Sequence, residues 1–317
     1  MKKRYLILSL IILSFVSLFL GASEISISQI LNNDIESLNV MLISRIPRLI
    51  TILLAGVGMS ICGLIMQSIS QNKFVSPTTG ATIDSAQLGI VFCTIFVPSA
   101  GIVEKSLIAF IFSLTGTFVF MTLLRKLKLK NVIFVPLIGI MLGNIIGAIT
   151  NFLGYKYDIM QSVGSWMQGS FSMILKGNYE LLYISVPLII IAILYANKFT
   201  VAGMGEDFST NLGLDYNKIV NIGLVIVALV TVSVIITAGS IPYIGLIVPN
   251  IVSLYKGDNL SENIFDTAVV GALFVLVCDI VSRIVIYPYE VSVGLTIGVI
   301  GSIVFLCMIL RRNYNEC

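Results

Sequence analysis

The sequence contains no histidine, and only 11% of its 317 residues are charged. Histidine is the commonest transition-metal ligand and the usual proton shuttle near neutral pH, so its absence argues against transport of bare metal ions. A soluble domain needs about a quarter of its residues charged. With 57% hydrophobic residues and a mean hydropathy of +1.03, the chain belongs in a lipid bilayer.

Two kinds of chemical signature are also missing. No G-x-x-x-x-G-K-[ST] loop is present, so nothing indicates that this chain hydrolyses ATP, and we expect no enzymatic activity. The five cysteines form no C-x-x-C pair and have no metal-site spacing, and they are expected to be packing residues. No metal site or bound cofactor is predicted, and a formal net charge of +3 gives no indication of nucleic-acid binding.

Apolar runs bounded by polar residues predict ten membrane-spanning helices, since a span needs about 20 mostly apolar residues. They are expected near residues 5 to 22, 47 to 68, 85 to 103, 106 to 124, 132 to 153, 179 to 197, 218 to 239, 241 to 255, 264 to 286 and 291 to 310. The connections are short, so residues 1–317 are expected to form one all-α transmembrane domain. The eighth span is only 15 residues long and contains Pro249, which leaves open whether it is continuous.

The distribution of basic residues predicts the orientation, because they favour the cytoplasmic ends of spans. With a cytoplasmic N-terminus, 13 of the 19 basic residues fall inside: Lys2, Lys3, Arg4, Lys73, Arg125, Lys126, Lys128, Lys130, Lys198, Lys218, Lys256, Arg311 and Arg312. Both termini of this multi-pass protein are therefore expected in the cytoplasm. The basic start and the apolar run to Gly21 also fit a cleaved signal peptide, but an uncleaved span is preferred because more spans follow.

Two connections are longer than simple turns require. The external one, 154–178, carries an amphipathic stretch around Trp166, the only tryptophan, which either anchors at the lipid headgroups or docks a partner. The cytoplasmic one, 197–218, carries G-M-G-E-D-F-S-T-N-L-G-L.

Few ionisable residues lie inside the predicted spans, where an ion-coupled carrier usually keeps them. Asp279 and Arg283 are four residues apart on one helix face, which favours a structural ion pair. Asp84 is most simply a helix N-cap. Glycines recur within spans, as in Gly56 to Gly63, where they favour close helix packing over the lining of a pathway.

Several motifs, in order along the chain, resemble the permeases of iron-siderophore, haem and cobalamin ABC importers, the FecCD or BtuC-like family. They are S-R-I-P-R-L at 44 to 49, S-I-C-G-L-I-M-Q-S-I-S-Q-N-K-F-V-S-P-T-T-G at 60 to 80, I-P-Y-I-G-L-I-V-P-N-I-V at 241 to 252 and C-D-I-V-S-R at 278 to 283. Tyr243 and Asn250 depart from the commonest pattern, which has a glycine-phenylalanine element and a histidine there. Asn250 and the N-K-F-V-S-P-T-T stretch instead resemble the subgroup that serves petrobactin-type and related catecholate or mixed-ligand siderophores in Gram-positive bacteria.

The resemblance implies a BtuC-like permease fold that imports an iron-siderophore complex using ATP hydrolysed by partner subunits. Its implied partners are a second permease subunit, two ABC ATPase subunits and an extracytoplasmic siderophore-binding lipoprotein. The family's external arginines, which pair with glutamates of the binding protein, match Arg45, Arg48 and Arg283, although interfacial snorkelling also fits them.

The loop from Gly203 to Lys218 resembles the family's segment that contacts the ATPase, with Leu212 and Gly213 at its L-G element and Gly205 and Glu206 beside it. An ordinary polar connection also fits this loop. The sequence does not specify the siderophore, or whether haem or cobalamin replaces it. It also does not distinguish a permease homodimer from a pair of related chains, although the subgroup favours the latter. An ion-coupled secondary carrier, a channel and a non-transporting scaffold are the rival classes.

Overall fold

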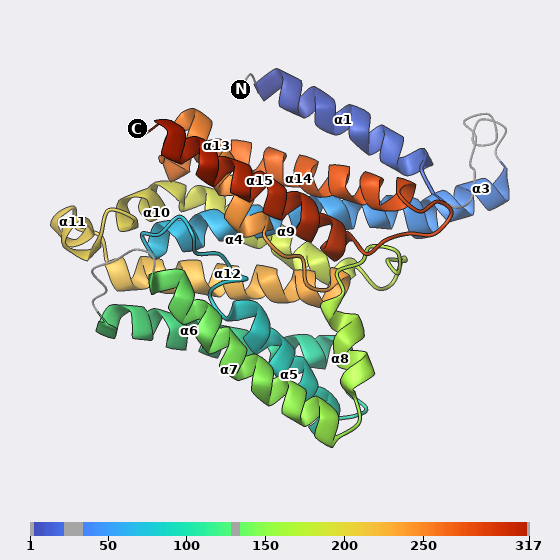
Figure 1. Cartoon of the computed structure of the whole chain (residues 1–317), viewed down its shortest axis with the longest axis horizontal. Coiled ribbons are helices and arrows are strands. Elements are labelled where there is room, and N and C mark those ends of the chain that lie inside the picture. Colours follow the sequence, from blue (N-terminus) through green and yellow to red (C-terminus); the bar gives the residue numbers. More distant parts are fainter. Residues whose placement is uncertain (1–2, 22–33, 128–133, 316–317) are drawn as a thin grey trace.

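All regular secondary structure in the residues that the computed structural model describes, 3–21, 34–127 and 134–315, is helical (Figure 1). The first half contains α1 (Lys3–Phe19), α3 (Ile35–Val40), the π-helix η1 (Met41–Arg45), α4 (Ile46–Ile69), α5 (Thr82–Phe96), α6 (Ile102–Leu127) and α7 (Phe134–Lys156). The second half contains α8 (Met160–Met167), the 3-10 helix η2 (Glu180–Ile184), α9 (Ser185–Leu194), α10 (Ala196–Ala202), α11 (Glu206–Asn211), α12 (Tyr216–Ala238), α13 (Ile244–Lys256), α14 (Leu260–Ile284) and α15 (Val293–Asn315).

Each of the ten predicted spans coincides with a helix of the structure or, for the sixth, with the pair α9 and α10. Within the described residues, five helical stretches are long and apolar enough to cross a membrane: Ile35–Ile69, Ile102–Leu124, Phe134–Lys156, Tyr216–Ala238 and Leu260–Ile284. The bent pair would make a sixth, and three further apolar helices are shorter. The predicted all-α polytopic class is confirmed, and several spans are shorter or less straight than their apolar runs suggest.

Helix α4 lies at the centre of the bundle and packs against α12, α13 and α14. Glycines make these approaches possible: a Cβ on Gly56 would lie 2.7 Å from the carbonyl oxygen of Gly271, and one on Gly63 would lie 1.9 Å from that of Gly245. Small residues let helix backbones approach closely in lipid, where burial from water does not drive association. The glycines of α4 therefore act in packing, as the sequence favours.

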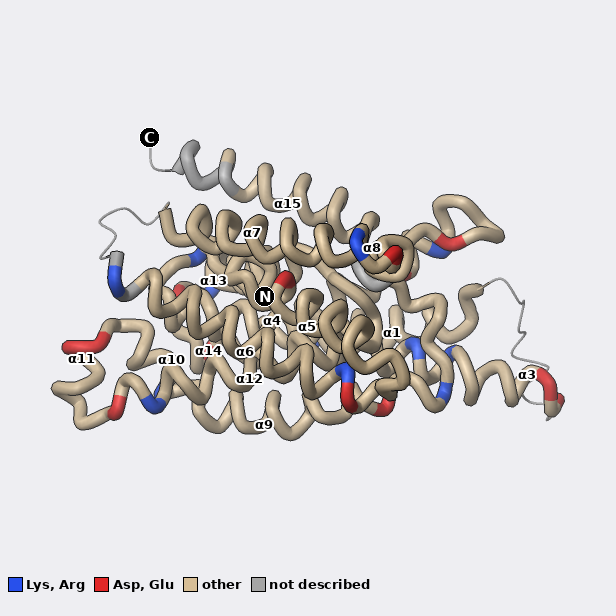
Figure 2. Tube along the Cα trace, turned by 90° about the horizontal axis from the view of Figure 1, so that it is seen from below, with Lys and Arg blue, Asp and Glu red and all other residues tan. Residues whose placement is uncertain are grey.

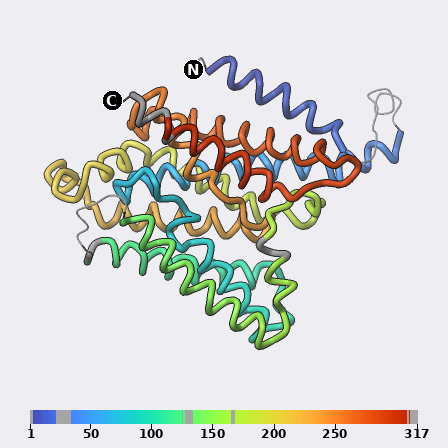
Figure 3. The backbone as a smooth tube through the Cα atoms, in the orientation of Figure 1, coloured from blue at the N-terminus to red at the C-terminus, as the bar shows by residue number. Residues whose placement is uncertain are grey.

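Helices α5, α6 and α7 lie side by side along one flank of the bundle (Figures 1 and 3). Helix α5 begins deep in this group, because the backbone of Thr79, just before α5, packs directly against Gly139 of α7. A Cβ on Gly139 would lie 1.7 Å from the carbonyl oxygen of Thr79. The interpretation of Asp84 as a helix N-cap is wrong. The cap residue is Ala81, in the left-handed conformation, and Asp84 lies within the first turn and makes no capping hydrogen bond.

Two of the spans are interrupted in different ways. The sixth bends by 62° between α9 and α10. The eighth, α13, is continuous despite Pro249, which leaves the carbonyl of Gly245 without its helical donor. The side-chain Nε2 of Gln67 in α4 lies 3.3 Å from that carbonyl oxygen and donates to it. A side chain of a neighbouring helix thus replaces the bond that proline removes.

Charged residues gather toward the two ends of the bundle and leave a largely uncharged middle (Figure 2). The start of α1, the end of α15 and helix α11 lie at one end, whereas α3 and α8 lie toward the other (Figure 1). This division fits a protein that crosses a bilayer with its long axis along the membrane normal.

Candidate functional site

A cluster of buried charges lies at the end of the bundle where α14 meets the start of α4. It comprises Arg45, Arg48, Asp279, Arg283 and Glu290, and is called the arginine cluster below. The three arginines are 8%, 6% and 4% exposed, and Asp279 is fully buried at 0%. Charges at such depth are stable only when paired and hydrogen-bonded, so each partner matters.

Arg48 connects α4 to two distant parts of the chain. Its Nη2 lies 2.8 Å from Oδ1 of Asp279 on α14, and its Nη1 lies 2.9 and 2.8 Å from Oε1 and Oε2 of Glu290, in the loop before α15. A guanidinium carries five donors in a fixed fork, which lets one arginine bind two carboxylates. Arg48 therefore joins α4, α14 and the following loop.

Arg283 occupies the other side of the same carboxylate. Its Nη2 pairs with Oδ2 of Asp279, so the ion pair that the four-residue spacing predicts is present in the structure. Its Nη1 donates to the carbonyl oxygens of Ser17 and Leu20, each at 2.9 Å, at the end of α1. Arg283 thus joins α14 to the first helix.

Arg45, the last residue of η1, donates to the carbonyl oxygen of Leu20 and lies directly against Gly21, where a Cβ would collide with its guanidinium. All three arginines are therefore engaged inside the molecule instead of extending from its surface. A partner that docked through them would have to open these contacts. Their predicted role in docking a binding protein stays a prediction.

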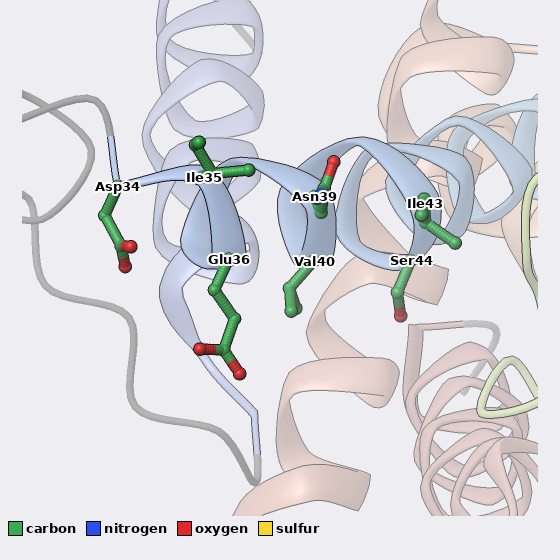
Figure 4. A pocket seen from close by; sticks show the side chains of 7 residues that line it. All are labelled: Asp34, Ile35, Glu36, Asn39, Val40, Ile43 and Ser44. Atoms are coloured by element: carbon green, nitrogen blue, oxygen red, sulfur yellow. The ribbon is translucent and has the colours of Figure 1, made fainter.

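The helical segment leading to Arg45 borders an outer pocket of about 580 Å³ (Figure 4). Figure 4 shows the side chains of Asp34 and Glu36 pointing to the same side of the helix as Ser44, whereas Ile35 points to the other. This pocket brings two carboxylates to the end of the bundle that holds the arginine cluster.

The predicted external connection, 154–178, is only partly a free loop. It contains α8, whose range includes Trp166, but the side chain of Trp166 lies outside the described part of the structure. Past α8 the chain turns into the bundle, because Phe171 and Ile174 are 1% and 2% exposed. The amide of Ser170 donates to the carbonyl of Ala238 at 2.9 Å and closes this segment over the end of α12.

The predicted coupling connection, 197–218, lies at the opposite end and forms the short helices α10 and α11. Gly205 and Gly213 have positive φ values of 109° and 76°, a conformation that side chains disfavour, and they bound α11 on either side. Ser209 fixes α11 to α10, because its hydroxyl donates to the carbonyl oxygens of Gly205 at 2.7 Å and Val201 at 3.0 Å. The segment is therefore a shaped element and not an irregular connection.

Three large apolar side chains of this segment face outward at a spacing of four residues. Met204, Phe208 and Leu212 are 57%, 48% and 58% exposed, while Glu206 beside them is exposed too. Phe208 lies on α11, and Met204 and Leu212 lie in the turns directly before and after it, so the three form an exposed apolar surface beside a carboxylate, called the apolar stripe below. Exposed apolar stripes of this kind with a polar rim mark protein interaction sites.

The two longest stretches that carry the family resemblance contact each other near this end. The side-chain Nδ2 of Asn250 donates to the carbonyl oxygen of Lys73 at 2.8 Å. The ammonium of Lys73 then lies 2.7 Å from Asp258, in the turn between α13 and α14. Asn250, which departs from the family's usual histidine, thus holds the segment after α4 against α13.

Sequence reasoning missed Glu290, the second carboxylate of the arginine cluster. The separation between Arg48 and Glu290 is 242 residues, so no local spacing could have linked them. The available signal was charge balance, because three arginines near one membrane face require more acidic partners than Asp279 alone.

Residues 9–311 match the model of the FecCD transport family. The chain is 54% identical over 313 residues to the petrobactin import system permease protein YclN of Bacillus subtilis (strain 168), covering 99% of each chain. It is 39% identical over 307 residues to the petrobactin import system permease protein FatD of Bacillus anthracis, covering 97% of this chain and 90% of that one.

Among solved structures, the chain resembles an ABC transporter assigned to the metal-chelate type and solved in an inward-facing conformation. The TM-score is 0.83 at 21% sequence identity, and the match covers 97% of this chain and 98% of the other, which confirms the predicted fold. The family match covers nearly the whole sequence, with helices at every predicted span. This chain belongs to the FecCD transport family, as a non-catalytic, multi-pass permease subunit of an ABC transporter whose ATP is hydrolysed by a partner ATPase.

Proposed function

We propose that this chain is the permease subunit of an importer that carries an iron-siderophore complex of the petrobactin or related catecholate type into the cytoplasm. The observation that carries this proposal is the 54% identity to a petrobactin import permease along essentially the full length of both chains. A second petrobactin permease at 39% identity supports the same cargo. No observation favours haem or cobalamin over it.

In this proposal the two ends of the bundle serve different partners. A siderophore-binding lipoprotein docks outside, at the end that holds the arginine cluster and the acidic pocket of Figure 4. An ABC ATPase docks inside, on the apolar stripe of Met204, Phe208 and Leu212. A second permease subunit, a related chain or another copy of this one, completes the pathway, and ATP binding switches the pair between inward-open and outward-open states.

The proposed cargo is tested by uptake of radioactive iron in cells that lack this chain. Iron is supplied as ferric petrobactin or as haem, and the cells carry either an empty vector or the wild-type gene. We expect loss of ferric petrobactin uptake alone, restored by the gene. Unchanged ferric petrobactin uptake in the deleted cells would contradict the cargo and leave the family membership intact.

The proposed docking role is tested separately with Arg45→Glu, because Arg45 is the last residue of η1 and directly follows the segment that borders the acidic pocket. Binding of the purified siderophore-binding protein to the transporter in nanodiscs is measured, with Lys105→Glu as the matched control. Lys105 lies near the start of α6, is not part of the cluster and is not among the 13 basic residues predicted to be cytoplasmic. We expect Arg45→Glu alone to weaken binding by about tenfold, the effect of roughly 1.4 kcal/mol. Equal binding by both variants would refute the docking role.

A further inference from the structure

Three buried polar side chains lie near the start of α14, which follows directly on the end of α13. Asn263, Asp266 and Thr267 are 2%, 1% and 0% exposed. One oxygen of each, Oδ1 of Asn263, Oδ1 of Asp266 and Oγ1 of Thr267, has no hydrogen-bond partner among the residues that the structure describes. The other buried side-chain atoms of this kind in those residues are scattered singly along the chain.

Two contacts with the end of α13 direct these oxygens away from solvent. The Nδ2 of Asn263 donates to the carbonyl oxygen of Gly257 at 2.6 Å, so Oδ1 of the same amide faces the opposite way. The ammonium of Lys256 pairs with Oδ2 of Asp266, which leaves Oδ1 on the other side of the carboxylate. Asn263 lies about one helical turn before both Asp266 and Thr267, and residues three and four apart share a helix face. The three oxygens are therefore presented on one face of α14, at its junction with α13.

The three oxygens restrict the chemistry of what they bind. The amide and carboxylate oxygens only accept hydrogen bonds, so a ligand has to supply positive charge or protons. No histidine or cysteine belongs to the set, which argues against a transition metal. Ca²⁺ and Mg²⁺ favour carboxylate oxygens, but the set has a single carboxylate whose charge is already shared with Lys256. Oxygen atoms of low total charge suit a monovalent cation, as the carbonyl oxygens of potassium channels do.

The ion pair with Lys256 is compatible with a second positive charge on the same carboxylate. The ammonium binds Oδ2 of Asp266, and the lysine side chain is 26% exposed, so water screens part of its charge. The chain already places two cationic groups on one buried carboxylate, because Asp279 binds Arg48 through Oδ1 and Arg283 through Oδ2. At Asp266 the second oxygen is buried on the helix face that carries the other two oxygen atoms.

We propose that Asn263, Asp266 and Thr267 bind a monovalent cation, Na⁺ or K⁺, at the junction of α13 and α14. This site lies at the end of the bundle that holds α11 (Figure 1). The amide of Ser261, beside the site, lies 3.1 Å from the hydroxyl oxygen of Thr200 on α10 and donates to it. The bound cation therefore stabilises the corner against which the predicted coupling segment rests. The site does not depend on the identity of the cargo.

Binding is measured directly with radioactive sodium, and with radioactive rubidium as a substitute for potassium, on the assembled transporter in nanodiscs. Choline chloride keeps the ionic strength constant. We expect saturable binding of a single ion per copy of this chain, displaced by unlabelled NaCl or KCl and not by choline, and the more effective salt identifies the ion. Absence of saturable binding for both ions would overturn the proposal, because water alone would then satisfy the three oxygens.

Thr267→Val tests whether the ion occupies this site, because valine has nearly the same shape as threonine and lacks the hydroxyl. We expect it to weaken binding of the ion at least about tenfold, while Thr267→Ser, which keeps the hydroxyl, binds as the wild type does. The matched control is Thr231→Val on α12, since Thr231 is also 0% exposed and its hydroxyl also lacks a partner among the described residues. Equal binding by the two valine variants would overturn the assignment of the ion to α14.

The stability of the wild-type transporter gives a second test that needs no variant. A ligand that binds only the folded protein raises its melting temperature. We expect the transporter to melt about 2–4 °C higher in saturating NaCl or KCl than in choline chloride of equal ionic strength. The difference should disappear in Thr267→Val and persist in Thr231→Val. Equal melting temperatures of the wild type in all three salts would contradict the cation site and leave the cargo assignment untouched.

Discussion

Asp279 is the residue on which the arginine cluster depends, because two guanidinium groups share its buried carboxylate. We predict that Asp279→Asn destabilises the protein strongly, since it leaves Arg48 and Arg283 buried with too little compensating charge. Breaking a buried ion pair from one side costs about 3–5 kcal/mol. The measurement is the melting temperature of the detergent-solubilised transporter.

Glu290→Gln is the matched control for that substitution. Glu290 also binds Arg48, but its side chain is 23% exposed, so water can replace part of the lost interaction. We expect a decrease in melting temperature much smaller than that of Asp279→Asn. Equal losses would mean that the cluster's stability depends on its total charge and not on the burial of Asp279.

The sequence predicted only the local part of this cluster. The four-residue spacing of Asp279 and Arg283 identified their pairing, because such residues share a helix face. The contact of Arg48 with Asp279 spans 231 residues, and it depends on how α4 and α14 pack. The sequence likewise identified arginines at one membrane face, but not that their side chains turn inward.

At the scale of helices, the contact between α4 and α13 depends on Gly63. We predict that Gly63→Ala prevents correct folding, because the new Cβ would meet the backbone of Gly245, with its carbonyl oxygen at 1.9 Å. Backbone cannot move aside as a flexible side chain can. The amount of correctly assembled transporter in membranes is the measurement.

Gly298→Ala provides the control, because a Cβ at Gly298 of α15 would meet nothing within 4 Å. There alanine is expected to be neutral or to stabilise the helix by up to about 1 kcal/mol. If both alanine variants assembled normally, the close approach of α4 and α13 would be wrong.

Apolar runs predicted where the helices lie, because the bilayer imposes their length and composition. They did not predict the 62° bend between α9 and α10 or the deep start of α5. The bend lies within a continuous apolar run, which has the same composition whether the chain is straight or bent, whereas α5 begins after the polar stretch S-P-T-T-G-A-T at 76 to 82, whose depth in the bundle composition does not reveal. The position of the α5 start depends on a distant neighbour, because the missing side chain of Gly139 on α7 leaves room for the backbone of Thr79.

At the scale of the whole molecule, the apolar stripe at α11 predicts the surface on which the ATPase docks. Phe208→Asp places a negative charge between Met204 and Leu212, at the centre of the apolar stripe. Docking would have to remove water from that charge, which opposes binding of the ATPase. We expect about a tenfold loss of ATPase subunit that copurifies with the permease. Thr210→Asp adds the same charge at an exposed position of the same helix, on the face opposite Phe208, and is expected to keep the complex, so equal loss in both would point to charge alone.

The orientation of the bundle is the remaining prediction, and it depends on the number of crossings. The start of α1 and the end of α15 lie at the same end as α11, as an even number of crossings requires (Figure 1). We predict that alkaline phosphatase, which is active only outside the cytoplasm, is inactive when fused after Cys317 and active when fused after Lys105. If α13 turned back without crossing, the fusion after Cys317 would be active while the fusion after Lys105 stayed active. Opposite activities at both sites would mean that the whole bundle is inverted, and α11 could then not meet an ATPase.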